Sequence, residues 1–353
     1  MLAVQPCRPQ QNGTNWAITH LPAPGLKAEL MGNFRAIVIA ALVAPVAGAW
    51  SAPTQNFPSK PIRIVLPGIA GSPGDVRARQ VAQKLSETLG QPVVVDNRPG
   101  ANGAISARQA AKAAPDGYTL LSCNVNHVLN DLLNPDPVSR LNHELVPITR
   151  LTSGPLILAV HPSVPAASLK EFIDLAKSRP GSLSHATGGQ GSLSHLLAEL
   201  IKSKTGVDIK GIPYKSTSAE IPDVLGGHIN ATFNYFQIIG PHFGSGRLRA
   251  LAVADATRLP VAPEIATMSE AGLPGVEATG WNGICAPAGV PKPVISLLHR
   301  ELVDALKDPA IRNQMISTGA TVGGDRPDEF AAYIRAELAK WGRVINDARI
   351  SLQ

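Results

Sequence analysis

The sequence predicts an α/β protein built from two lobes with a ligand cleft between them. Strand-like and helix-like patterns alternate along most of the chain, which is typical of parallel sheets with right-handed crossovers. The length of 353 residues exceeds what one hydrophobic core usually supports. No low-complexity linker divides the alternating pattern. In such folds, ligands bind at the carboxyl ends of strands, near helix N-termini.

The first run of elements begins with a β-branched strand at 62–66, after Pro61. Helical periodicity over 75–89 then stops at Gly90, a residue suited to the end of a helix. The run continues with a strand at 93–95, a helix at 104–114 and a strand at 118–121. This β-α-β-α-β order predicts a parallel sheet.

A second run repeats the alternation. Its predicted strands lie at 156–160, 183–186, 209–213, 229–233 and 248–252, and its helices at 169–178, 193–204 and 220–225. The C-terminal part is mainly helical, over 293–307, 310–317 and 328–347.

Residues 1–49 are predicted to be a leader followed by a signal peptide. Arg35 supplies a basic start, 36–46 are apolar, and Ala47-Gly48-Ala49 fits the small-x-small cleavage pattern. Translation could begin at Met31, or 1–30 could be a genuine leader. No later apolar segment reaches the ~18 residues of a membrane span. We therefore expect a soluble mature protein in the periplasm.

The charge of the chain argues against nucleic-acid binding. Its formal net charge is +6, but no dense Lys/Arg run and no basic patch interleaved with aromatic residues is present. A mild positive charge is compatible with a small anionic ligand.

The cysteines and histidines match no metal-binding pattern, and we expect no metal or cofactor. Cys7, Cys123 and Cys285 form no Cys-x-x-Cys pair. Cys123 and Cys285 could pair in an oxidising compartment. We prefer the interpretation that they are two buried free thiols.

Two loops rich in small residues, 67–75 and 187–195, each join a predicted strand to a helix N-terminus. Small residues let the backbone approach a ligand, and the helix N-terminus offers unpaired N–H groups that suit a carboxylate or phosphate. The first loop is equally compatible with a tight turn in which Asp75 caps its helix. Two such loops on facing lobes could hold both ends of a diacid.

Templates for enzymes do not fit. Gly189-x-Gly191 lacks the third glycine of a dinucleotide fingerprint, and no phosphate-cradling loop or nucleophile elbow occurs. Ser192, Ser194 and His195 are close in sequence, but neighbours on a helix do not face each other. We expect packing or hydrogen-bonding roles for the histidines His127, His185 and His195, and no enzymatic activity.

An ordered set of motifs resembles the solute receptors of tripartite tricarboxylate transporters, also called Bug receptors. The resemblance runs from about residue 57 to 353. Its motifs are Phe57-Pro58-Ser59-Lys60-Pro61-Ile62-Arg63-Ile64-Val65, the 67–75 loop, Leu89-Gly90-Gln91-Pro92-Val93-Val94-Val95-Asp96-Asn97-Arg98-Pro99-Gly100, Ala113-Ala114-Pro115-Asp116-Gly117-Tyr118-Thr119-Leu120, Pro213-Tyr214-Lys215, Leu225-Gly226-Gly227, Leu248-Arg249-Ala250-Leu251-Ala252, Glu270-Ala271-Gly272-Leu273-Pro274-Gly275 and Ala286-Pro287-Ala288-Gly289.

This resemblance implies a type II periplasmic-binding-protein fold with a Venus-flytrap cleft. Lobe one would be discontinuous, at 57–157 and 281–353, and lobe two would cover 158–280. The hinge segments would lie near 155–162 and 280–287. The implied function is capture of a small organic carboxylate, with closure of the cleft around it and docking on permease subunits in the membrane. We expect a monomer, because a hinged receptor needs both lobes free to move. The alternative is a ligand-sensing receptor that feeds a sensor kinase.

The resemblance also implies a ligand site on three loops, where backbone N–H groups and waters hold the carboxylates. The residues expected to bind the ligand are Ile69, Ala70, Gly71, Ser72, Asn124, Asn126, Thr187, Gly188, Gly189, Ser192 and Asn234. The chain departs from the family pattern at Gly68, Ile69, Ser72, Gly74, Ser216 and Asn234. Because the family has Asp at position 234, we hypothesise that Asn234 faces the cleft and disfavours a ligand with an ammonium group.

Overall fold

The computed structural model describes residues 57–134, 141 and 143–350, so the signal segment predicted at 34–49 lies outside the described residues. The strands are β1 Ile62–Leu66, β2 Val93–Asn97, β3 Thr119–Asn124, β4 Leu145–Val160, β5 Leu183–Thr187, β6 Ile209–Pro213, β7 Ala231–Tyr235, β8 Arg249–Val253, β9 Thr279–Pro287 and β10 Thr321–Val322. The α-helices are α1 Pro73–Leu89, α2 Ala104–Ala111, α3 Val125–Leu133, α4 Leu169–Ser178, α5 Leu193–Thr205, α6 Ile221–Leu225, α7 Phe236–Ile239, α8 Lys292–Lys307, α9 Pro309–Ser317 and α10 Pro327–Asp347. Two short 3-10 helices lie at Ala101–Gly103 and Gly240–His242.

Local sequence explains where α1 begins and ends. The Ser72 hydroxyl accepts a hydrogen bond from the Asp75 N–H (3.3 Å), and Pro73 occupies the first turn. Gly90, with φ of 65°, ends the helix in the left-handed conformation. The apolar residues recur with helical spacing and are buried against the sheet, at Ala78, Val81, Ala82 and Leu85.

Two sheets share one long strand. The hydrogen-bonded order is β2-β1-β3-β9-β4-β7-β5-β6, with β10 and β8 also paired to β4. In the first sheet β2, β1 and β3 are parallel, and β9 is antiparallel to both β3 and β4. The second sheet repeats this plan, with β6, β5 and β7 parallel and β4 antiparallel to β7. In each sheet, the first strand of the parallel group (β1 or β5) therefore lies between the other two (β2 and β3, or β6 and β7).

The chain passes from one sheet to the other at two adjacent points. Residues 145–155 of β4 pair with β9, and residues 156–160 pair with β7 and β8. The return passage comes just before β9, where the Leu156 N–H donates to the Ala278 carbonyl (3.0 Å). Ala254 links the same two residues through bonds of 2.8 and 2.9 Å. Both passages therefore lie within one small hydrogen-bonded group.

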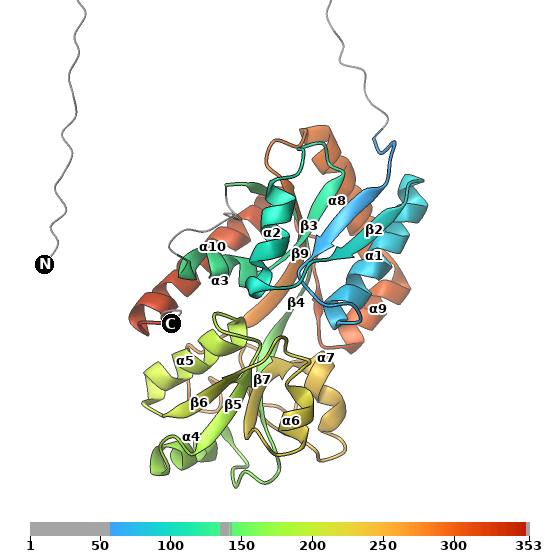
Figure 1. Cartoon of the computed structure of the whole chain (residues 1–353). Coiled ribbons are helices and arrows are strands. Elements are labelled where there is room, and N and C mark those ends of the chain that lie inside the picture. The colour runs from blue at the N-terminus through green and yellow to red at the C-terminus, as the bar shows by residue number, and fades with distance from the viewer. Residues whose placement is uncertain (1–56, 135–140, 142, 351–353) are drawn as a thin grey trace, which may run out of the picture. The chain divides into compact units, whose positions relative to one another are not determined.

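Helices cover both faces of each sheet (Figure 1). On the first sheet, α1, α8 and α9 pack on one face and α2, α3 and α10 on the other. On the second sheet, α4 and α5 pack on one face and α6 and α7 on the other. The largest apolar cluster extends over both sheets and contains the fully buried Leu158 of β4, Phe172 of α4 and Trp341 of α10. The core is therefore continuous through β4.

Most of the predicted elements are present, and three are found at the same residues: β1, α4 and β6. The sequence patterns missed β9, β10, α3, α7 and the first half of β4. Trp281 and Cys285 of β9 are buried, but the strand also contains Gly280 and Gly283, which weaken a strand pattern. Helix α3 starts immediately after β3, so no turn separates the alternating pattern of the strand from the helical pattern that follows.

The preferred interpretation of the two cysteines is wrong, because Cys123 and Cys285 form a disulfide with a Cα–Cα distance of 6.0 Å. Cys123 lies on β3 opposite Gly283, and Cys285 lies on β9 opposite Leu121. The antiparallel pairing of two strands far apart in sequence brings the cysteines together. Both side chains are fully buried in the core.

No helix among the described residues is both long and apolar enough to cross a membrane. Likewise, within 57–134, 141 and 143–350, no group of three or more His, Cys, Asp or Glu side chains could hold a metal ion.

Candidate functional site

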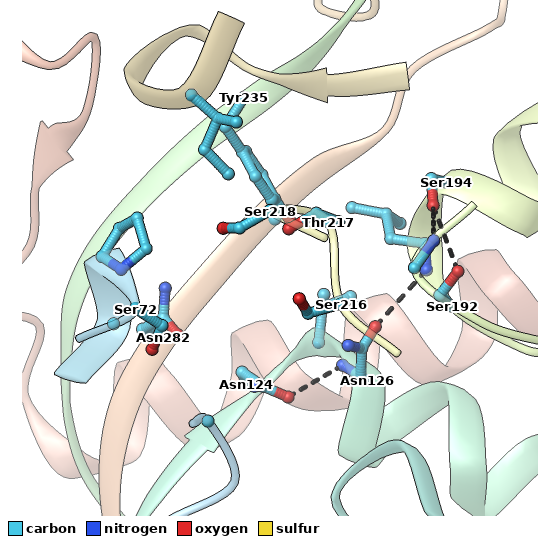
Figure 2. A pocket seen from close by; sticks show the side chains of 18 of the residues that line it. Ser72, Asn124, Asn126, Ser192, Ser194, Ser216, Thr217, Ser218, Tyr235 and Asn282 are labelled. Atoms are coloured by element: carbon cyan, nitrogen blue, oxygen red, sulfur yellow. Dashed lines mark hydrogen bonds between the residues drawn. The ribbon is translucent and has the colours of Figure 1, made fainter. Parts of the chain in front are cut away.

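A pocket of about 670 Å³ opens between the carboxyl ends of the parallel strands of the two sheets. Its walls come from the segments that follow β1, β2, β3, β5, β6 and β7, from the two passages between the sheets, and from residues 318–320 before β10. Figure 2 shows Ser72 and Asn282 on one side of the open space and Asn126, Ser192 and Ser194 on the other. The volume lies in the range of small-molecule sites, about 300–1,000 Å³.

The loops after β1 and β5 have the same turn. In the first, Gly71 has φ of 77° and its N–H donates to Asp75 Oδ2 (3.0 Å). In the second, Gly191 has φ of 73° and its N–H donates to His195 Nδ1 (3.1 Å). These positive φ values favour glycine. The two turns therefore set the N-termini of α1 and α5 at equivalent ends of the two sheets.

Serine caps complete both turns. Ser72 and Ser192 accept hydrogen bonds from the backbone N–H groups three residues later, at 3.3 Å in each case. Each serine N–H in turn donates to the carbonyl of the residue three positions earlier, at 3.2 Å. Because the hydroxyls lie at the helix N-termini and line the pocket, they can donate to a bound anion.

Asp75 serves the first loop rather than the pocket. Burial alone would raise the pKa of its carboxyl, but hydrogen bonds from Arg79, Gly71 and Asn97 outweigh burial and lower that pKa. The Asn97 amide donates both to Asp75 Oδ1 and to the Gly68 carbonyl, at 2.9 Å each. Asp75 is therefore an ionised group that fixes the loop, and the helix cap expected from Asp75 is supplied instead by Ser72.

A third loop is built around His127, which is buried. Its Nδ1 accepts from the Asn124 N–H (3.0 Å), and the Asn124 side chain accepts from the Asn126 N–H (3.1 Å). Burial lowers the pKa of His127 to about 4, so the ring is neutral at pH 7. The result is a capped start for α3 with both asparagine side chains on the pocket wall.

Three hydrogen bonds connect the first sheet with the second across the pocket. Asn102 Nδ2 donates to the Gly191 carbonyl (3.0 Å), and Asn126 Oδ1 accepts from the Leu193 N–H (3.3 Å). Arg77 Nη1 on α1 donates to Gln237 Oε1 on α7. Side chains of the first sheet's helices thus contact the start of α5 and α7.

The structure places seven of the predicted site residues on the pocket wall: Ile69, Ser72, Asn124, Asn126, Gly188, Gly189 and Ser192. The other four do not line it: Ala70, Gly71, Thr187 and Asn234. The Thr187 hydroxyl faces its own turn and accepts from the Gly189 N–H (3.3 Å). Gly71 is occupied by its bond to Asp75.

The expectation that position 234 faces the cleft is not met. Asn234 is fully buried, and its amide donates to the Thr217 carbonyl (2.8 Å) and to Glu220 Oε1 (2.9 Å). Glu220 is also fully buried and accepts from the Thr232 hydroxyl. Burial raises the pKa of Glu220 to about 7. Asn234 therefore holds the 216–218 loop from behind the pocket wall.

Several lining residues were not predicted: Arg77, Ser216, Thr217, Ser218, Tyr235, Gln237 and Asn282. A usable signal existed for Tyr235, because it ends a parallel strand, where ligands bind. Burial raises the pKa of Tyr235 to about 12, so its phenol stays protonated at pH 7. A Cβ on Gly280 would lie 2.2 Å from the Tyr235 oxygen, so only glycine leaves room for this ring.

The charges on the pocket wall are all positive. Among the described residues, the only charged ones that line it are Arg77 and Lys215, and no Asp or Glu does. Serine, threonine, asparagine and tyrosine side chains supply neutral hydrogen-bond donors. With the N-termini of α1, α3 and α5 all at the pocket, the arrangement favours a small anion.

Comparison with known proteins agrees with this geometry. A family model described as tripartite tricarboxylate transporter family receptor matches residues 77–350. BugT of Bordetella pertussis is 36% identical over 319 residues, which cover 90% of this chain and 96% of that protein.

Two solved structures are also similar to this chain over most of its length. A Rhodopseudomonas palustris protein solved with adipate is 31% identical, with a TM-score of 0.79, covering 84% of this chain and 99% of that one. The periplasmic binding protein BugD is also 31% identical, with a TM-score of 0.78, covering 84% of this chain and 100% of that one. The predicted fold class and the family resemblance are confirmed.

Proposed function

Because the chain belongs to the tripartite tricarboxylate transporter receptor family, we propose that it captures a small organic carboxylate in the periplasm and delivers it to a membrane permease. The family is one of periplasmic solute-binding receptors. The signal peptide expected at 34–49 would direct export. In this proposal the receptor acts as a monomer, since its lobes must be free to move.

The charge of the pocket wall is the observation that carries the proposal. A carboxylate that enters a pocket with two cations and no acidic residue gains attraction without repulsion. The serines at the starts of α1 and α5 add donors from opposite sides. The adipate found in the Rhodopseudomonas palustris relative supports the same ligand class for this chain.

Capture would proceed by closure of two lobes, at 57–157 with 281–353 and at 158–280. The adjacent passages at Leu156 and Ala278 support this division, because so few residues connect the two sheets there. The bonds from Asn102 and Asn126 to the start of α5 would form as the cleft closes. The ligand would then be enclosed, and the closed form would present the surface that a permease recognises.

A thermal-shift screen of the purified protein tests this function. Mono-, di- and tricarboxylates would be compared with amines, sugars and amino acids. A ligand at about 100 times its dissociation constant adds about 2.7 kcal/mol, which for a folded part of about 300 residues corresponds to a shift on the order of 4 °C. We expect carboxylates alone to raise the midpoint, without being consumed.

A retained ligand would mask such shifts. The protein would therefore also be unfolded and any released small molecule identified by mass spectrometry, with refolded protein used for a second screen. Stabilisation by amines or sugars but by no carboxylate would refute the proposal.

A further inference from the structure

Among the residues that the structure describes, Arg77 has no acidic partner, although it lines a pocket and is partly buried. Its guanidinium donates to the neutral side chain of Gln237. Burial lowers the pKa of Arg77, and Tyr235 is the one group that opposes this effect. The side chain remains charged at neutral pH. A guanidinium in this position has lost part of its hydration without gaining a counter-charge.

Two nearby cations, Arg79 and Lys215, differ from Arg77: one is paired with a carboxylate and the other is exposed to solvent. Arg79, two residues further along α1, is bound to the Asp75 carboxylate (3.0 Å) and to Asn97 (2.9 Å). Lys215, the second cation of the pocket wall, is exposed to solvent. Arg77 is thus the lining cation that is both partly desolvated and without a carboxylate. An anionic group in the pocket would therefore interact more favourably with Arg77 than with Lys215.

Arg77 also lies apart from the serines and asparagines of the three loops. It sits more than one turn into α1, whereas Ser72 caps the start of that helix. Its neighbour Gln237 belongs to α7, which follows β7 and not β5. The loop donor Ser192 caps α5, whereas Arg77 contacts α7, so the guanidinium offers a separate place for a second acidic group.

We propose that Arg77 determines specificity by binding a second carboxylate of the ligand, so that the receptor selects dicarboxylates over monocarboxylates. This inference rests on the proposed carboxylate-binding function. Gln237 holds the guanidinium in place before the ligand arrives, and the second carboxylate replaces it as the partner. A bidentate arginine–carboxylate pair in a closed, desolvated cleft is a strong interaction.

Isothermal titration calorimetry on the purified protein tests the inference. The probes are the dicarboxylates from succinate to suberate, each paired with the monocarboxylate of equal carbon number. In the wild-type protein we expect the best dicarboxylate to bind about 10- to 100-fold more tightly than its monocarboxylate partner, as for a hydrogen bond to a charged group. Arg77→Gln should remove most of that preference and leave monocarboxylate affinity nearly unchanged. Arg77→Lys should keep part of it.

Two further variants separate the explanations. Arg335→Gln removes the same charge from an exposed position on α10, away from the pocket wall, and should leave the preference intact. Gln237→Ala should also keep the preference. If Gln237→Ala has the effect of Arg77→Gln, the arginine acts by joining α1 to α7 and the inference is wrong.

The remaining outcomes distinguish the inference from the function beneath it. Equal loss of mono- and dicarboxylate affinity in Arg77→Gln, or a wild-type protein without preference, overturns the role of Arg77 and leaves a carboxylate receptor. A wild-type protein, freed of retained ligand, that binds none of the probes or other carboxylates overturns the proposed function itself.

Discussion

Replacing Cys123 and Cys285 by alanine removes a cross-link that encloses the whole second sheet. The two cysteines are 162 residues apart, and the chain between them includes every strand from β4 to β8. On the chain-entropy model, a closed loop of that length constrains the unfolded chain by about 5 kcal/mol. We expect the double variant to lose a free energy of unfolding of this order.

Urea denaturation followed by circular dichroism measures the loss. With a slope of about 3 kcal/mol per M, the midpoint should fall by roughly 1.5 M. Reductant should lower the midpoint of the wild-type protein toward the same value and leave the variant unchanged. A loss below about 1 kcal/mol, or an equal effect of reductant on both proteins, would refute the reasoning.

Three further predictions follow from the loops and the buried histidines. Asn126→Ala removes an acceptor for α5, and calorimetry should show about fivefold weaker ligand binding. Gly191→Ala, at φ of 73°, should cost about 1–2 kcal/mol in urea denaturation, whereas Gly244→Ala, in open space at a position without positive φ, should change stability little. Burial lowers the pKa of His127 and of His185 to about 4. Below about pH 6.5 the unfolded histidines bind protons and the native ones do not, so each should lower the free energy of unfolding by up to about 3 kcal/mol at pH 4. The raised pKa of Glu220 has the opposite effect between about pH 7 and 4.5, so the net loss should be about that of one histidine. An unchanged urea midpoint across that range would contradict this account.

The order of elements could be predicted from sequence because it depends on local patterns. The strand at 62–66 alternates with helices whose caps, such as Ser72 and Gly90, are themselves encoded locally. The pairing of Cys123 with Cys285 could not be predicted in this way, because it depends on β9 lying beside β3. No local pattern reports the partner of a strand that returns from the far end of the chain.

The sequence predicts the loops whose backbone forms part of the pocket wall better than the side chains that complete the wall. The loops after β1 and β5 stood out because glycine and serine are concentrated there. The side chain of Asn234 lies behind the wall, because adjacent residues of a strand point to opposite faces and Tyr235 takes the pocket side. Arg77 resembled a residue on the solvated face of an amphipathic helix. Only the position of α7 shows that this face is covered.

The unbroken course of β4 through both sheets would limit how the two proposed lobes can move. A pair of bodies joined by flexible tethers could slide, tilt and twist independently. In the proposed closure, the strand and the bonds at Leu156, Ala254 and Ala278 would act as a stiff joint, and one torsional coordinate would carry most of the relative motion. Opening and closing then trace the same path in reverse. Substitutions at this joint should therefore change ligand capture and ligand release rates together, even though no side chain there needs to touch the ligand.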